Sequence, residues 1–231
     1  MMKLKKTFSY ISALTISLIT ALFPLPANAQ RHHMRSTVER DTVALFRGIA
    51  VSVDAVGAIQ RWVSDYGQYE GALKLNLKDR YFPTIEFGYG DADHDDEVTG
   101  IHYTSKAPYG RVGIDFNLLK DKHDIYRLYL GARYGYTSFK YSIDSPGIED
   151  PLWQTHSDYS MKDIQCKYHW AEAVAGVQAK IAGPLHLGWS VRYRSRLSQK
   201  HGDAGEPWYV PGFGKSGSSR LGAIFNIILE L

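Results

Sequence analysis

Charged side chains stand at every second position in several segments of this sequence. In the segment 185–197, for example, Arg192 and Arg194 alternate with Val191 and Tyr193. A period of two places charged residues on one face of an extended strand and apolar residues on the other. The polar faces of such segments carry the following candidate residues: Asp54, Glu70, Lys74, Glu86, Arg111, Asp115, Arg127, Arg133, Glu172, Arg192 and Arg194.

Two kinds of chemistry fit this set. Charges enclosed by a sheet must pair, because an unpaired buried charge is very costly. We therefore expect a packed network of ion pairs, in which Arg192 and Arg194 pair with acids such as Glu70, Glu86 and Glu172. The alternative is a narrow pore or a ligand-binding or transport site that uses the arginine-rich interior.

A second candidate site is the acidic run DADHDDE. Its carboxylates, led by Asp91, Asp93 and Asp95, are hard oxygen ligands of the kind that bind Ca²⁺. The run lacks the glycine turn and the distal glutamate of a calcium-binding loop. We expect an acidic surface loop rather than a metal site, and no cofactor.

Catalytic sets are also conceivable around three histidines. The candidates are His94 with Asp95, His102 with Ser105, and the run 156–158. Adjacent residues of a strand face opposite sides, and none of these sets matches a catalytic signature. We expect that the protein is not an enzyme; a lipid-modifying outer-membrane enzyme is a further alternative.

The N-terminus has the features of a secretory signal peptide. Lysines at positions 3, 5 and 6 precede an apolar run at 11–23, which two prolines and the cleavage signal Ala27-Asn28-Ala29 follow. The run is too short for a spanning helix. We predict a cleaved signal peptide over 1–29, a short periplasmic leader over 30–43 and one domain over 44–231.

Removal of the signal peptide changes the charge balance. The whole chain has 27 basic and 24 acidic residues; the segment 1–29 holds three lysines and no acid, so 27 − 3 = 24 basic residues remain and the net charge is zero. Nucleic acid is therefore not an expected partner. The single cysteine, Cys166, excludes an internal disulfide.

Eight alternating segments account for most of the remaining chain. They span about 48–58, 69–77, 81–89, 110–117, 126–136, 171–181, 185–197 and 220–231. The connections after the second, fourth and sixth are short, whereas 91–107, 138–168 and 198–218 are long. This pattern is typical of bacterial outer-membrane barrels. We predict an all-β fold, an eight-stranded antiparallel transmembrane β-barrel with short periplasmic turns and longer surface loops, located in the outer membrane.

Aromatic residues support the barrel over a soluble secreted sandwich. In the predicted register they lie at the two ends of the apolar strand faces. This is the arrangement expected of two aromatic girdles, one at each membrane interface. The girdle residues are Tyr81, Phe116 and Tyr126 at the periplasmic ends, and Tyr69, Tyr89, Tyr134, Tyr136 and Tyr193 at the surface ends.

The predicted surface loops contain aromatics of a kind that is common at protein interfaces. Trp208, Tyr209 and Phe213 are the foremost candidates for contacts. We therefore expect a structural or surface-interaction role, with outer-membrane lipid and another envelope protein as partners.

The second half of the chain resembles a known family. The run WAEAVAGVQAKIAGPLHLGWSVRYRSRL from Trp170, the run WYVPGFGK from Trp208 and the final alternating strand resemble an uncharacterised family of outer-membrane barrels from Bacteroidota-type Gram-negative bacteria, the domain-of-unknown-function family 6048. The resemblance implies an outer-membrane barrel and supplies no activity. One departure from outer-membrane proteins generally is the final Leu231, where many have an aromatic residue.

Overall fold

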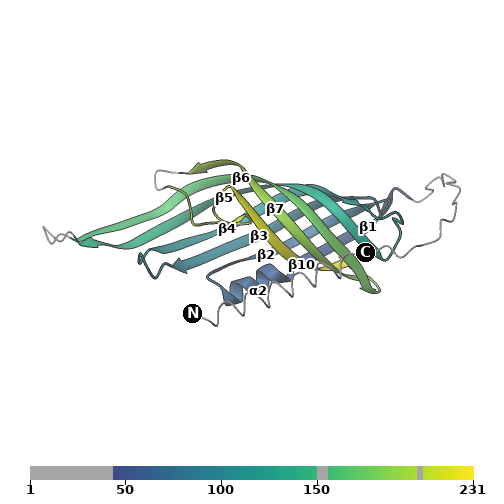
Figure 1. Cartoon of the computed structure of the whole chain (residues 1–231), viewed down its shortest axis with the longest axis horizontal. Coiled ribbons are helices and arrows are strands. Elements are labelled where there is room, and N and C mark those ends of the chain that lie inside the picture. The colour runs from purple at the N-terminus through teal and green to yellow at the C-terminus, as the bar shows by residue number, and fades with distance from the viewer. Residues whose placement is uncertain (1–43, 150–155, 202–204) are drawn as a thin grey trace, which may run out of the picture. The chain divides into compact units, whose positions relative to one another are not determined.

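Eight antiparallel strands form a closed barrel (Figure 1). The computed structural model describes residues 44–149, 156–201 and 205–231, so the predicted signal peptide and leader lie outside the described residues. The strands are β1 (Phe46–Asp54), β2 (Tyr66–Leu77), β3 (Tyr81–Asp95), β4 (His102–Asn117), β5 (Tyr126–Glu149), β6 (His156–Ala182), β7 (Leu185–His201) and β10 (Ser219–Glu230). The predicted fold class is confirmed.

The ring closes between the first and last strands, and its order is β1-β10-β7-β6-β5-β4-β3-β2. Ile49 and Leu231 exchange two backbone hydrogen bonds, N–H to O, at 3.0 and 2.7 Å. The described chain thus begins and ends at one end of the barrel, beside the short turns at 78–80, 118–125 and 183–184. We call this the turn end, and the opposite end the hairpin end.

The first strand is shorter than predicted. β1 ends at Asp54, and helix α2 (Ala55–Val63) occupies the positions predicted as the end of a strand and its tip. The carboxylate of Asp54 accepts hydrogen bonds from the backbone N–H groups of Val56 and Gly57, at 3.0 and 3.1 Å, and so caps the helix. Val56, Ile59 and Val63 have the i, i+3, i+7 spacing of one helix face, so the sequence did contain a helical pattern at these positions.

Two predicted loops are wrong, because the strands continue through them. β3 and β4 extend to a short tip at 96–101, and β5 and β6 extend to Glu149 and His156. In these extensions the apolar residues face inward and the polar residues outward, the reverse of the pattern nearer the turn end. The prediction assumed one polarity for the whole strand, so it ended each strand where the polarity changes.

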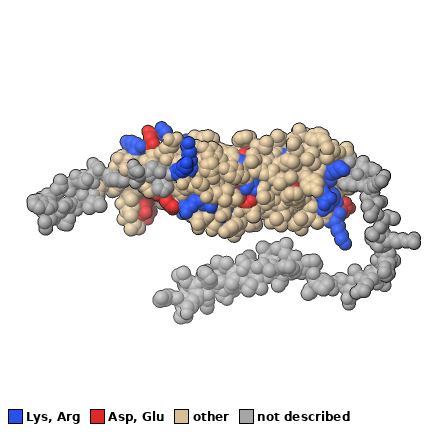
Figure 2. Space-filling model, turned by 90° about the horizontal axis from the view of Figure 1, so that it is seen from above, with Lys and Arg blue, Asp and Glu red and all other residues tan. Residues whose placement is uncertain are grey.

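An apolar belt surrounds the barrel between the two ends. All eight predicted girdle residues are exposed on the outer face, and Val112, Val191 and Leu130 between them are about half exposed. Figure 2 shows most of the visible charged residues toward the two ends, and mainly other residues between them. Among the described residues, no helix is long and apolar enough to cross a membrane.

The inside of the barrel at the hairpin end is a protein core. Residues 205–218, which we call the plug, fold back among the strands and include the small sheet of β8 (Tyr209–Val210) and β9 (Gly214–Lys215). The phenol of Tyr209 donates to the carbonyl of Gly67, and the phenol of Tyr103 donates to the carbonyl of Tyr209. The core consists of Ala92, Tyr103, Ala107, Tyr109, Phe139, Tyr141, Cys166, Tyr168, Trp170, Tyr209, Val210 and Phe213.

Candidate functional site

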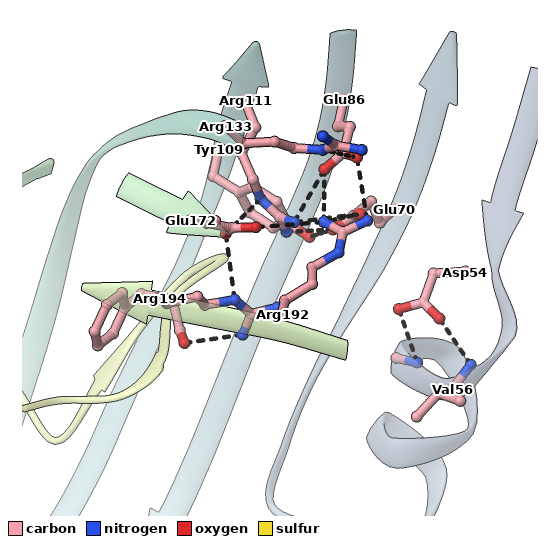
Figure 3. Close-up of polar contacts among 12 residues, drawn as sticks. Asp54, Val56, Glu70, Glu86, Tyr109, Arg111, Arg133, Glu172, Arg192 and Arg194 are labelled. Atoms are coloured by element: carbon pink, nitrogen blue, oxygen red, sulfur yellow. Dashed lines mark hydrogen bonds and ion pairs between the residues drawn. The ribbon is translucent and has the colours of Figure 1, made fainter. Parts of the chain in front are cut away.

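Below the plug, charged side chains fill the middle of the barrel (Figure 3). Each stands on an inward-facing position of its strand, as the alternation predicts, and each is buried. β2, β3, β4, β5, β6 and β7 all contribute. We call these residues the central cluster: Glu70, Lys74, Glu86, Arg111, Asp115, Arg133, Glu172, Arg192 and Arg194.

Glu86 is the hub of the central cluster. Its carboxylate accepts hydrogen bonds from Arg192 at 2.7 and 3.1 Å, from Arg133 at 2.7 Å and from Arg111 at 3.0 Å. Three guanidinium groups from three strands therefore converge on one carboxylate. Charge-assisted hydrogen bonds of this kind are stronger than neutral ones, and the planar guanidinium fixes their direction.

Further acids complete the neutralisation on either side of Glu86. Toward the hairpin end, Arg111 pairs with Glu70, and its Nε lies 3.4 Å from Glu172. Toward the turn end, Asp115 accepts hydrogen bonds from Arg133 at 2.7 and 3.0 Å and from Lys74 at 2.9 Å. The sequence thus supplies a partner for each of these charges.

The upper edge of the cluster carries an excess positive charge. The cluster counts five cations, Lys74 and four arginines, against four carboxylates. Arg194 shares Glu172 with other arginines: its Nε lies 3.2 Å from that carboxylate, and its Nη1 donates to the carbonyl of Phe213 at 3.0 Å. A carbonyl of the plug therefore takes the place of a fifth acid.

Two uncharged residues that the prediction missed also belong to the cluster. The phenol of Tyr109 donates to Glu70 at 2.6 Å, and the indole of Trp170 donates to Glu172 at 2.7 Å. Both residues are inward-facing by simple extension of the predicted strands. Extending the alternation of these two strands by one residue would therefore have identified both residues as inward-facing.

Two predicted members of the network lie elsewhere. Asp54 caps α2 instead, through its hydrogen bonds to Val56 and Gly57. Arg127 lies nearer the turn end, where it forms two hydrogen bonds with Glu230 at 2.8 and 2.9 Å. Asn76 and His186 also contact Glu230, so a second, smaller polar cluster lines the turn end.

Asp79, in the turn between β2 and β3, is a second strongly connected carboxylate of the turn end. Burial alone would raise its pKa, but hydrogen bonds from Asn76 and His123 and the charges of Arg47 and Arg127 lower the pKa below its ordinary value. The Asp79 carboxylate lies 2.6 Å from the ring of His123 and 3.2 Å from Arg47. It therefore ties the turns of the barrel together.

The cavities of the barrel are unequal along its length. Beside Lys74 and Phe82 the space is only about 10 Å³, which is room for about one water molecule. A polar cavity of about 250 Å³ opens at the turn end. A larger cavity of about 500 Å³ lies beside α2 and the plug.

The plug corrects the prediction of an exposed contact loop. Tyr209 and Phe213 are 1% and 0% exposed, so both point into the protein and away from solvent. Trp208 is half-buried, and its ring stacks on that of His94 with centroids 4.1 Å apart. The predicted exposure of Tyr209 and Phe213 was wrong, because an apolar surface inside the hairpin end was available to cover them.

The acidic run is not a loop either. Asp91, Asp93 and Asp95 stand at alternate positions of β3, on its outer face. Asp91 lies 3.3 Å from Arg61, and Asp95 lies 2.6 Å from His102. No group of three or more metal-ligating side chains comes together within the described ranges.

The candidate catalytic sets are divided by the strands. His94 and Asp95 stand on opposite faces of β3; His102 and Ser105 stand on opposite faces of β4. His94 instead lies 2.8 Å from Asp65. The side chains of 156–158 lie outside the described residues, and the absence of enzymatic activity stays a prediction.

A family match covers nearly the whole chain. The family described as a domain of unknown function, DUF6048, matches residues 8–230. No curated protein matches.

Among the solved structures that resemble this chain are two that each cover 80% of this chain and 98% of their own, at a TM-score of 0.40. One is Ail, the attachment invasion locus protein of Yersinia pestis, in complex with the heparin analogue sucrose octasulfate, at 11% identity. The other is a major outer membrane protein from Thermus thermophilus, at 16% identity.

Proposed function

The chain belongs to the DUF6048 family, and we propose that it is a non-conducting outer-membrane barrel that acts at the cell surface through its β5–β6 hairpin. The apolar belt and its two girdles support insertion into a bilayer, since only helices and closed barrels satisfy their backbone groups there. With the turns facing the periplasm, the hairpin end lies at the surface.

Two features argue against passage of solutes. The central cluster fills the lumen with paired side chains, as the narrow interior of an eight-stranded barrel allows. The plug then covers the hairpin end. The space beside Lys74 and Phe82 admits about one water molecule.

The observation that carries a surface role is the length of β5 and β6. β5 pairs with β4 only as far as Asp144, opposite His102, and β6 pairs with β7 only as far as Cys166, opposite His201. Beyond these points β5 and β6 pair with each other, and no other described strand flanks them. Figure 1 shows this hairpin extending past the rest of the barrel.

Free strand edges explain how such a hairpin could bind another protein. An edge presents unpaired backbone N–H and C=O groups, to which an extended segment of a partner can add as a further strand. The outward-facing side chains Lys162 and Gln165 are exposed and polar, so the hairpin is suited to water. A surface protein with an extended segment is the partner proposed.

The test is site-specific photo-crosslinking in intact cells. A photoreactive residue at Lys162 should give a discrete crosslinked protein band, whereas the same residue at Val98, on the exposed tip of the β3–β4 hairpin, should not. Replacement of 146–158 by an Asn-Gly turn should abolish the partner's recovery with a crosslinker at Gln165 while the barrel still folds. No band at Lys162, or equal bands at both positions, would count against the hairpin.

The pore alternative has its own experiment. Purified protein in planar bilayers should produce no channels. Stepwise conductance by the wild type, lost when Arg192 is replaced by Met, would favour the pore instead.

A further inference from the structure

The wall of the barrel is incomplete on one side. β1 ends at Asp54, opposite Asn226 of β10, and its last pair with β2 joins Val53 to Gly71. Toward the hairpin end β2 continues to Tyr66 and β10 continues to Ser219, but among the described strands neither has a partner on the side of this gap. Helix α2 lies there instead, against β2 and β10 (Figure 1).

The cavity of about 500 Å³ occupies this gap. Both faces of β10 line it: Gly222 and Ile224 occupy inward-facing positions, whereas Leu221 and Ala223 occupy outward-facing positions. One cavity can reach both faces of a strand only where it passes the strand's edge. The cavity therefore connects the outer surface of the barrel with its interior, and we call it the lateral crevice.

The outer mouth of the lateral crevice is apolar. Ile59 of α2 is 61% exposed and Leu221 of β10 is 73% exposed, and both line the cavity. The neighbouring Trp62 is also exposed on α2. In a bilayer these side chains face acyl chains, so the crevice opens toward lipid and not toward water.

The upper part of the crevice is cationic. The guanidinium of Arg220 donates to the carbonyls of Lys215 and Ser216, at 2.8 and 3.4 Å. The ammonium group of Lys215 lies over the rings of Trp208 and Tyr66, 4.9 and 5.4 Å from their centroids. Within the part of the chain that the structure describes, neither cation is paired with a carboxylate, so both are available to an anion.

The depth of these groups follows from the strand register. Leu221 pairs with Tyr193, a residue of the aromatic girdle at the hairpin end. Arg220 stands one residue beyond that girdle, at the level of lipid headgroups, whereas Ala223 stands below it, at the level of acyl chains. The crevice thus has a cationic part at the headgroup level and an apolar part at the acyl level.

We propose that the lateral crevice binds a phosphorylated acyl lipid of the surface-side leaflet. Lys215 and Arg220 hold the phosphate, and one acyl chain lies between Ile59 of α2 and Leu221 and Ala223 of β10. A volume of about 500 Å³ is typical of sites for single small ligands. The surface-side position rests on the orientation proposed above, whereas phosphate binding does not.

The experiment measures lipid retention by the full chain in detergent, by native mass spectrometry. Lipid A, as the phosphorylated lipid of that leaflet, should bind with a stoichiometry of one. Lys215→Gln with Arg220→Gln should weaken binding on the order of tenfold or more, since each removes a charge-assisted contact. Gly222→Phe should weaken the binding of both lipid A and its dephosphorylated form, because the ring enters the cavity.

Matched controls separate these effects from loss of the fold. Lys162→Gln with Lys167→Gln removes two exposed cations on the outer face of β6 and should leave binding unchanged. Gel migration with and without heating reports folding of every variant. Equal binding of lipid A and dephosphorylated lipid A, or equal binding by the double variant and its control, would refute the phosphate site. Tighter binding of phosphatidylglycerol than of lipid A would refute the surface-side source.

Discussion

Arg192 and Glu86 meet across the width of the barrel. Their strands, β7 and β3, are separated by three strands in either direction around the ring, and the two side chains form hydrogen bonds of 2.7 and 3.1 Å. Pairing across the lumen connects opposite walls of the barrel. The central cluster therefore fixes the distance between these walls and also fills the space between them.

Glu86→Gln should destabilise the barrel strongly. The change leaves Arg111, Arg133 and Arg192 with one carboxylate fewer in a buried setting, and breaking such a network costs about 3–5 kcal/mol. Urea unfolding in lipid vesicles, followed by tryptophan fluorescence, measures the loss. The control, Glu97→Gln at the exposed tip 96–101, should change little. Equal midpoints for the two variants would contradict the hub role of Glu86.

Asp79 should contribute stability that depends on pH. Its folded pKa is lowered, so the contribution is complete above the unfolded pKa of about 3.9 and is lost as pH falls through the folded pKa. Wild type and Asp79→Asn should therefore differ in unfolding free energy at pH 6 and converge at lower pH. Asp124→Asn, an exposed carboxylate nearby, serves as control. A difference that grows on acidification would have the wrong sign.

The plug should depend on the glycine at position 212. Gly212 has φ +82°, and a Cβ there would lie 2.5 Å from the ring of Tyr109. Gly205 has φ +87°, and a Cβ there would meet no atom of the described residues within 4 Å, apart from its chain neighbours. Substitution by alanine therefore causes similar backbone strain at both positions, but only at position 212 does it also cause a steric clash with Tyr109. We expect Gly212→Ala to lose about 1–3 kcal/mol more than Gly205→Ala. Faster proteolysis of the plug in folded Gly212→Ala protein provides a second readout.

The apolar belt should show a depth profile. Ile85→Arg places a charge midway between the girdle residues Tyr81 and Tyr89 of β3 and should cost about 2–4 kcal/mol in vesicles, whereas Leu118→Arg, beyond the girdle residue Phe116, should cost about 0–1 kcal/mol. Both native side chains are about half exposed. In detergent-free, lipid-reconstituted samples, equal costs would argue that the belt does not lie in hydrocarbon.

Much of the barrel could be predicted because the residues of a transmembrane strand face the lumen and the lipid alternately, which gives the sequence a period of two. The alternation predicted that Arg192 and Glu86 face the inside of the barrel. The aromatic residues at the strand ends predicted the levels of the two membrane interfaces. The pairing acids were also expected, since a narrow lumen leaves few partners within reach.

The missed features share a physical cause. Above the girdle at the hairpin end the surroundings change from lipid to water, so residues such as Tyr141 and Tyr168 turn inward while the strands continue. The plug covers that inward surface, which only the assembled barrel creates. α2 was missed because the strand whose alternation ends at Ala55 was continued to Ala58, whereas Asp54 in fact caps a helix that begins at Ala55.

The short β1 also bears on assembly. Five residue pairs join β1 to β10, against eleven that join β10 to β7. The first and last strands of the chain thus meet along the least extensive junction of the ring, and closing it completes the tube. Seven junctions join the eight strands into an open sheet, and the short β1–β10 junction beside α2 closes that sheet into a tube.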